Sequence, residues 1–133
     1  MIEVQNISKS FGNNAVLRDV SFKVAEGESL AIIGRSGTGK SVLLKHLVGL
    51  LMPDDGSVRV QGGEINNMPE RELLAVRRQF GMLFQGAALF DSMNVAENIA
   101  FPLRRAGETD EAKIQQCVSE MLRLVEMPGV ETK

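Results

Sequence analysis

The chain has 133 residues, of which 44% are hydrophobic and 24% charged, as in soluble globular domains, and this composition excludes a disordered chain. The 15 Lys and Arg residues and the 17 Asp and Glu residues leave a net charge of −2, which disfavours bulk binding to nucleic acid. Cys117 is the single cysteine and His46 the single histidine, so an internal disulfide and a Cys/His zinc site are both excluded.

Alternation of apolar and polar residues predicts three strands with one solvent-facing side in the first half of the chain. They lie at residues 2–5, 20–24 and 57–60. Residues 29–33 are instead apolar at successive positions and precede Gly34, which predicts a strand covered on both faces, as in a parallel sheet. A further short apolar strand is expected at residues 81–85.

Three segments before the last part of the chain are expected to be helices. Residues 41–52 follow a glycine-rich turn. Residues 69–79 form a charged helix with Pro69 at an early position, where the missing N–H of proline is harmless. Residues 95–105 form a helix that Pro102 interrupts.

The last helix has the clearest pattern, because its apolar residues recur at helical spacing on one face. These residues are Ile114, Cys117, Val118, Met121, Leu122 and Val125. Thr109 is expected to cap the start of this helix. Cys117 is interpreted as a small buried hydrophobic residue, and His46, two turns into the helix at 41–52, as a packing or surface residue.

The sequence G-R-S-G-T-G-K-S at residues 34–41 matches the phosphate-binding pattern G-x-x-x-x-G-K-[ST] at every fixed position. Its three glycines let backbone N–H groups point inward, and the following helix adds its positive end. Lys40 can reach the β- and γ-phosphates of a nucleotide, and the Ser41 hydroxyl can ligate Mg²⁺. The alternative is a plain glycine-rich turn with a surface lysine. The loop alone does not choose among kinases, GTPases, motors and transporters.

Other segments extend this loop to a pattern that resembles the ATP-binding cassette (ABC) ATPases over essentially the whole chain. Ser36 and Gly37 fit that family's form of the loop, G-x-S-G-x-G-K-[ST]. The further similar segments are residues 10–12, 15–17, 20–22, 49–56, 81–85 and 88–99. Residues 82–85, 88–91 and 101–104 are most similar to the ATPase subunit of the Mla phospholipid-transport systems. Amino-acid importers and lipoprotein-release ATPases share much of this pattern.

The resemblance implies an α/β P-loop NTPase fold. Residues 1–85 would form an antiparallel β-subdomain and the P-loop part of a RecA-like core, and residues 86–133 the beginning of a helical subdomain. It also implies that ATP and Mg²⁺ bind, and that their binding is coupled to transport, here of phospholipid.

The resemblance assigns roles to individual residues. Phe11 would stack on adenine and Val16 would touch the edge of the base. The remaining nucleotide contacts would be Gly34, Ser36, Gly37, Thr38, Gly39, Lys40, Ser41 and Val42. Lys40 and Gln85 would be catalytic, and Ser41 and Gln85 would ligate the metal. From the residues alone, Phe11 is equally readable as a core residue beside a turn, and Gln85 as a polar residue ending a strand.

The implied partners are a second copy of the nucleotide-binding subunit and an integral-membrane permease, with no nucleic acid. The permease would contact the segment 86–103, in which Phe90, Met93 and Phe101 are either exposed contacts or local core. No signal peptide is visible, and the most apolar stretch, 42–52, is far shorter than the roughly 20 residues of a membrane span. The expected location is therefore cytoplasmic, on the inner face of the cell membrane through the permease.

Motifs on which hydrolysis depends in this family do not occur in the sequence. They are the Walker B strand ending in Asp-Glu, the L-S-G-G-Q signature, the D-loop and the switch histidine. We therefore expect the N-terminal part of a longer ABC ATPase domain, inactive by itself. Two alternatives remain open: another P-loop enzyme such as a small-molecule kinase, and a non-catalytic fragment that binds nucleotide or a permease. The direction of transport is not indicated.

Overall fold

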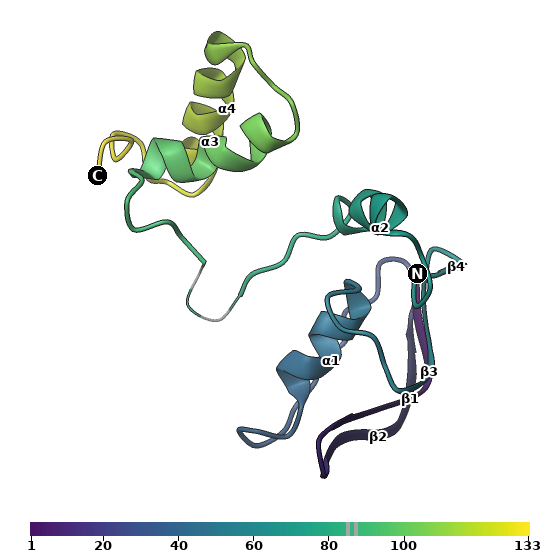
Figure 1. The fold of residues 1–133 in the computed structure, drawn as a ribbon. Coiled ribbons are helices and arrows are strands. Elements are labelled where there is room, and N and C mark those ends of the chain that lie inside the picture. The colour runs from purple at the N-terminus through teal and green to yellow at the C-terminus, as the bar shows by residue number, and fades with distance from the viewer. Residues whose placement is uncertain (85, 87) are drawn as a thin grey trace. The chain divides into compact units, whose positions relative to one another are not determined.

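The computed structural model describes residues 1–84, 86 and 88–133 of the chain. It divides into two compact units, Met1–Gly81 and Met82–Lys133 (Figure 1). In the described residues the first unit contains four strands and two helices, and the second contains two helices. Each unit has a hydrophobic core of its own.

The first unit is built on an antiparallel sheet with the strand order β2-β1-β3-β4. The strands are β1 (Ile2–Phe11), β2 (Asn14–Val24), β3 (Asp55–Val60) and β4 (Gly63–Glu64). A tight turn joins β1 to β2, where Phe11 pairs with Asn14, and β1 also pairs with β3, where Val4 lies opposite Val58. The three strands that alternation predicts are thereby confirmed.

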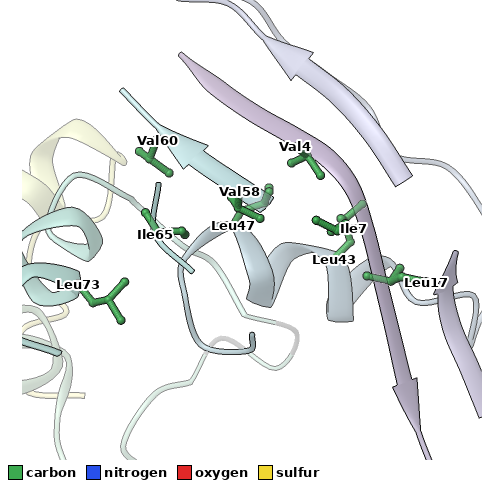
Figure 2. Close-up of a cluster of buried hydrophobic side chains, with 9 residues drawn as sticks. All are labelled: Val4, Ile7, Leu17, Leu43, Leu47, Val58, Val60, Ile65 and Leu73. Atoms are coloured by element: carbon green, nitrogen blue, oxygen red, sulfur yellow. The ribbon is translucent and has the colours of Figure 1, made fainter. Parts of the chain in front are cut away.

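Helix α1 (Lys40–Leu47) packs on this sheet through its apolar side. Figure 2 shows Leu43 and Leu47 of α1 among the sheet residues Val4, Ile7 and Val58, all of them buried. Fully burying an aliphatic side chain of this size contributes about 1.5–3 kcal/mol. This core therefore fixes the start of α1, and with it the loop at residues 34–39, against the sheet.

Helix α1 ends earlier than expected, because the sequence at its end forms a Schellman motif. Leu50 N–H donates to Lys45 O at 2.9 Å, and Gly49 N–H donates to His46 O at 3.0 Å. Gly49 has φ +64°, and a Cβ there would lie 2.8 Å from Leu73 Cδ2. The predicted helix over 41–52 is therefore wrong beyond Leu47, since only glycine satisfies both the left-handed backbone and the close packing at Gly49.

Helix α2 (Glu70–Arg77) lies within the predicted segment 69–79, and Pro69 is its N-cap residue. Leu73 is its buried residue and joins the core of the first unit. Arg77, in its last turn, donates to Val48 O and Gly49 O at the end of α1. Side-chain donors of α2 thus satisfy carbonyl groups that the end of α1 leaves without helical partners.

The expected strands at residues 29–33 and 81–85 are not observed. Residues 29–33 and 81–84 have no regular secondary structure, and Ile33 is 93% exposed. A strand exists through hydrogen bonds to a neighbouring strand, and in the described part of the chain no strand pairs with either segment. The apolar run at residues 29–33 is present in the sequence, but it does not join a sheet in the described structure. Gln85, the expected end of the second strand, lies outside the described residues.

The second unit consists of α3 (Val95–Arg105) and α4 (Glu111–Leu124), which pack through buried Ala100, Ile114, Val118 and Leu122. A reciprocal capping box between Asn94 and Glu97 starts α3, and the helix continues through Pro102 without a break. Asp110, not Thr109, caps α4, because its carboxylate accepts hydrogen bonds from Ala112 N–H and Lys113 N–H. Within the described ranges, no helix combines the length and the apolar character needed to cross a membrane.

Candidate nucleotide-binding site

The loop that precedes α1 is held tightly against β2. Gly39 is buried and has φ +90°. A Cβ at this position would lie 2.8 Å from Val16 Cγ1, closer than real Cβ atoms approach, and 3.2 Å from Val16 O, tighter than most real Cβ contacts. The last glycine of the loop therefore permits both the left-handed backbone and the contact with β2. The structure thus brings Val16, a residue assigned to the site from sequence, next to the loop.

Lys40, the first residue of α1, folds back over the loop. Its Nζ donates to Gly34 O and to Arg35 O, each at 2.7 Å. Thr38 Oγ1 donates to the same Arg35 O at 2.8 Å, so the loop closes on itself around these carbonyl groups. Among the described residues no carboxylate forms an ion pair with Lys40. The ammonium charge is therefore compensated only by neutral carbonyl groups and is available to an anion.

The positive end of α1 is also uncompensated. In the part of the chain that the structure describes, no side chain caps α1 and its first turn contains no acidic residue. The first N–H groups of a helix have no partner inside the helix, and the helix dipole favours negative charge there. The loop residues Gly34, Ser36, Gly37 and Thr38 are exposed beside this end. Together these groups have the chemistry of a phosphate-binding cradle.

Ser41 and Val42 follow Lys40 in the first turn of α1 and differ in environment. Ser41 is exposed, so its hydroxyl is accessible to a metal ion bound with a nucleotide. Val42 is half-buried and packs against the core of the first unit. No cluster of three or more His, Cys, Asp or Glu side chains could hold a metal ion in the described ranges. Gln85, the second expected metal ligand, lies outside them.

Phe11 ends β1 and is 48% exposed, outside the buried core. This exposure argues against the interpretation of Phe11 as a core residue beside a turn. The ring has a cation near it, because Lys9 Nζ lies 5.8 Å from its centroid. An accessible aromatic ring on the hairpin that carries Val16 is suited to stacking on a planar base.

Sequence reasoning missed the pair formed by Lys9 and Asp54, whose Nζ and Oδ1 atoms lie 2.6 Å apart. The two residues are separated by 44 others, and no local pattern relates them. The sequence weakly indicated only that Lys9 lies near Phe11, because residues two positions apart in a strand face the same side. It did not indicate the partner Asp54.

His46 is a packing residue and not a ligand in the described structure. It is 1% exposed, and its Nδ1 lies 2.7 Å from Val42 O. Nε2 is buried and has no hydrogen-bond partner among the described residues. The expectation of a packing residue is thereby confirmed. Cys117, expected to be buried, is half-buried on α4.

Apolar residues of the second unit, together with Asp91, Asn98 and Lys133, line a small pocket of about 310 Å³ beside α3. Phe90 is exposed and packs on Phe101, with ring centroids 4.7 Å apart and planes inclined by 53°. Met93 and Phe101 are half-buried. Of the three residues expected to be either surface contacts or local core, Phe90 is thus exposed, while Met93 and Phe101 are half-buried outside the core of the second unit.

The chain is similar to known proteins of one family. A family model described as "ABC transporter" matches residues 17–133. The "Probable ribonucleotide transport ATP-binding protein mkl" of Mycobacterium leprae is 46% identical over 132 residues, 99% of this chain and 38% of that protein. The "Protein TRIGALACTOSYLDIACYLGLYCEROL 3, chloroplastic" of Arabidopsis thaliana is 41% identical over 133 residues, 100% of this chain and 38% of that protein. The "Methionine import ATP-binding protein MetN" of Clostridium tetani is 41% identical over 133 residues, 100% of this chain and 41% of that protein.

Solved structures agree with these relatives. A dimeric post-hydrolysis state of the ATP-binding cassette MJ0796, bound to ADP and Pi, gives a TM-score of 0.83 at 28% identity, with 100% of this chain and 61% of that one covered. A dimeric structure of the same bacterial ABC transporter cassette gives a TM-score of 0.86 at 27% identity, with 99% and 60% covered. The chain spans 38–41% of the length of the three curated relatives. With the phosphate-binding loop, the P-loop NTPase fold and the family match in agreement, the chain belongs to the ABC transporter family.

Proposed function

We propose that this chain is the nucleotide-binding half of an ABC ATPase subunit that couples ATP binding and hydrolysis to transport. The observation that carries the proposal is the loop at residues 34–41. There the uncompensated ammonium of Lys40 and the uncapped end of α1 meet in one exposed turn. A triphosphate supplies the negative charge and the acceptor oxygens that these groups require.

The proposed nucleotide contacts are those that the family resemblance assigns. Backbone N–H groups and Lys40 bind the phosphates in a loop formed by Gly34, Ser36, Gly37, Thr38, Gly39, Lys40, Ser41 and Val42. Phe11 stacks on the adenine and Val16 contacts the edge of the base. Ser41 and Gln85 would hold Mg²⁺, which would supply positive charge to neutralise the phosphate oxygens. The exposure of Phe11 and Ser41 and the contact of Val16 with Gly39 support these roles.

The cargo that we propose is phospholipid, on the resemblance of residues 82–85, 88–91 and 101–104 to phospholipid-transport ATPases. Curated relatives at 46% and 41% identity are named for ribonucleotide transport and methionine import, so these are the competing cargoes. The complete subunit would act as a homodimer on a membrane permease at the inner face of the cell membrane. The ATPase rate of the complete transporter in detergent micelles, to which each candidate cargo is added separately, distinguishes the three cargoes. We expect phospholipid to stimulate the ATPase rate and methionine and ribonucleotide not to do so. Stimulation by methionine alone or by ribonucleotide alone would refute the proposal that phospholipid is the cargo.

A non-catalytic role fits residues 1–133 taken alone. The Walker B acid, the signature loop and the switch histidine, which supply catalysis in this family, are absent from the 133 residues. Transfer of a phosphoryl group to water needs a positioned water and stabilisation of the charge that develops on the γ-phosphate. We therefore propose that this chain binds ATP without sustained turnover. Membership of the ABC transporter family argues against the alternative of a small-molecule kinase.

Calorimetric titration with MgATP tests the phosphate-binding role of Lys40. A charge-assisted contact is worth about 1.5–3 kcal/mol, so Lys40→Ala should weaken MgATP binding roughly 10- to 150-fold. Lys45→Ala is the matched control, because Lys45 is an exposed lysine of the same helix outside the loop. Equal affinity of the wild-type and Lys40→Ala chains, with both folded by circular dichroism, would refute the assignment.

A further inference from the structure

The turn between α1 and β3 is fastened to the end of β1 through Asp54. Asp54 N–H donates to Ser8 O at 2.9 Å, and Ser10 N–H donates to Asp54 Oδ2 at 2.7 Å. Lys9 Nζ donates to Asp54 Oδ1 at 2.6 Å. One residue thus contacts three successive residues of β1, directly before Phe11.

Lys9 connects this turn to the ring of Phe11. Its Nζ lies over the ring, 5.8 Å from the centroid, within the distance at which a cation and an aromatic face attract each other. The side chain of Lys9 is 18% exposed, whereas that of Asp54 is 48% exposed. The ammonium group is therefore held between a carboxylate on one side and an aromatic face on the other, on a largely buried stem.

We infer that Lys9 and Asp54 are positioning residues that hold the ring of Phe11 ready for stacking on the base of the nucleotide. The inference rests on the proposed function, in which Phe11 binds that base. An exposed side chain at the tip of a hairpin loses rotamer freedom when a ligand immobilises it. A cation fixed over one face of the ring restricts the ring beforehand and leaves the opposite face for the base.

The ion pair also separates this role from direct binding of phosphate. The charge of Lys9 is already paired with the carboxylate of Asp54, whereas the described structure gives Lys40 only neutral carbonyl partners. Attraction of Lys9 for a triphosphate is therefore offset by repulsion from Asp54. The pair should affect the base-dependent part of the affinity and not the phosphate-dependent part.

The test compares MgATP with inorganic tripolyphosphate, which lacks the base and the sugar. Lys9→Met keeps the aliphatic stem and removes the charge, and Asp54→Asn keeps an oxygen acceptor for Ser10 N–H while removing the ion pair. Each should lower the affinity for MgATP relative to that for tripolyphosphate by about 3- to 10-fold, a part of the stacking contribution, because the charge that either change leaves unpaired acts on both ligands. Lys9→Arg, which retains a cation, should bind MgATP like wild type. Lys23→Met, at an exposed lysine of β2, is the control and should change neither affinity.

Phe11→Ala completes the experiment as a double-mutant cycle. In the Phe11→Ala background, Lys9→Met should have no further effect on the affinity for MgATP relative to that for tripolyphosphate. Equal losses for MgATP and tripolyphosphate in Lys9→Met, or no loss in either, would overturn the inference. So would an undiminished effect of Lys9→Met in the Phe11→Ala background. If Phe11→Ala itself leaves MgATP affinity unchanged, the stacking role of Phe11 fails and the inference fails with it. A loss in Phe11→Ala without a loss in Lys9→Met refutes only the positioning role.

Discussion

At the scale of single residues, two kinds of residue shape the candidate site. Glycines allow the backbone to approach a neighbouring segment closely, and charged side chains interact with partners that the structure identifies. Gly39 and Gly37 both have positive φ, at +90° and +80°. Only Gly39 would place a Cβ against other atoms, since nothing lies within 4 Å at Gly37. Substitutions at the two positions therefore separate the energetic cost of steric overlap from the cost of the left-handed backbone.

Gly39→Ala should lower the free energy of unfolding more than Gly37→Ala does. Alanine at either position pays for the left-handed backbone, about 1–3 kcal/mol. At Gly39 the new Cβ also meets Val16 Cγ1 and Val16 O, so the loop must move away from β2. Urea unfolding of the two variants measures the difference. Equal destabilisation would show that the contact between the loop and β2 is not constraining.

The Asp54 carboxylate should make the free energy of unfolding depend on pH. The hydrogen bond from Lys9, then that from Ser10 N–H, lower the pKa of the Asp54 carboxyl below its usual value of 3.8, against a smaller opposing effect of desolvation. The unfolded chain therefore binds a proton at Asp54 more readily than the folded chain does. Its contribution to stability is fully present above the unfolded pKa and is lost as the pH falls through the lower folded pKa.

Comparison of wild type with Asp54→Asn by urea unfolding measures this contribution. The wild-type advantage should be constant from about pH 5 to pH 7 and should shrink as the pH falls below about 4. An advantage that grows on acidification would reverse the sign of the linkage and contradict the ion pair with Lys9.

At the scale of elements, the strongest local patterns predicted the structure best. Strand β1 forms where alternation predicts it, and α4 buries Ile114, Val118 and Leu122, whereas Met121 and Val125, which the pattern also placed on the apolar face, are exposed. The prediction of a strand at residues 29–33 was wrong because a strand requires a neighbouring strand to which its backbone can hydrogen-bond. An apolar run alone does not supply that neighbour. The end of α1 was misplaced because Gly49, which falls inside the predicted helix over 41–52, forms its C-terminal cap instead.

The candidate site shows the same division between local and distant information. Its loop was predictable because the pattern at residues 34–41 is local and each position has a chemical reason. The contact of Gly39 with Val16 and the pair of Lys9 with Asp54 join segments far apart in sequence. Such contacts follow from the register of β1 and β2 and from the path of the turn after α1, which a single sequence does not reveal.

Arg77 provides a prediction for the junction of α1 and α2. Its Nε donates to Val48 O at 3.0 Å and its Nη2 to Gly49 O at 2.8 Å, while Nη1 pairs with Glu70. Arg77→Ala removes these donors from partly buried carbonyl groups and should lower the free energy of unfolding by about 1–3 kcal/mol. The exposed neighbour Arg78 is the control, and Arg78→Ala should change stability by less than about 0.5 kcal/mol. Equal effects of the two variants in urea unfolding would contradict the capping role.

At the scale of the whole molecule, the first unit contains the phosphate-binding loop and the hairpin residues of the proposed nucleotide site. Its core holds α1 on the sheet, α1 begins at the phosphate-binding loop, and the hairpin of β1 and β2 carries Phe11 and Val16. The second unit is a pair of helices with a core of its own and a small apolar pocket. We propose that binding and turnover of ATP are separable in this chain, because the first unit contains the phosphate-binding loop, while the Walker B acid and the signature loop of the family do not occur in these 133 residues.

The most direct test of this account is one incubation of the purified chain with ATP labelled at the γ-phosphate, in which retained nucleotide and released phosphate are measured together. The account predicts that intact ATP is retained, that Lys40→Ala abolishes most of this retention, and that phosphate release does not exceed the release from the Lys40→Ala sample. Sustained, multiple-turnover release that depends on Lys40 would contradict the account, because the chain would then contain a catalytic group beyond those identified. Absence of retained ATP in the folded wild-type chain would contradict its central claim, that the loop at residues 34–41 binds the nucleotide.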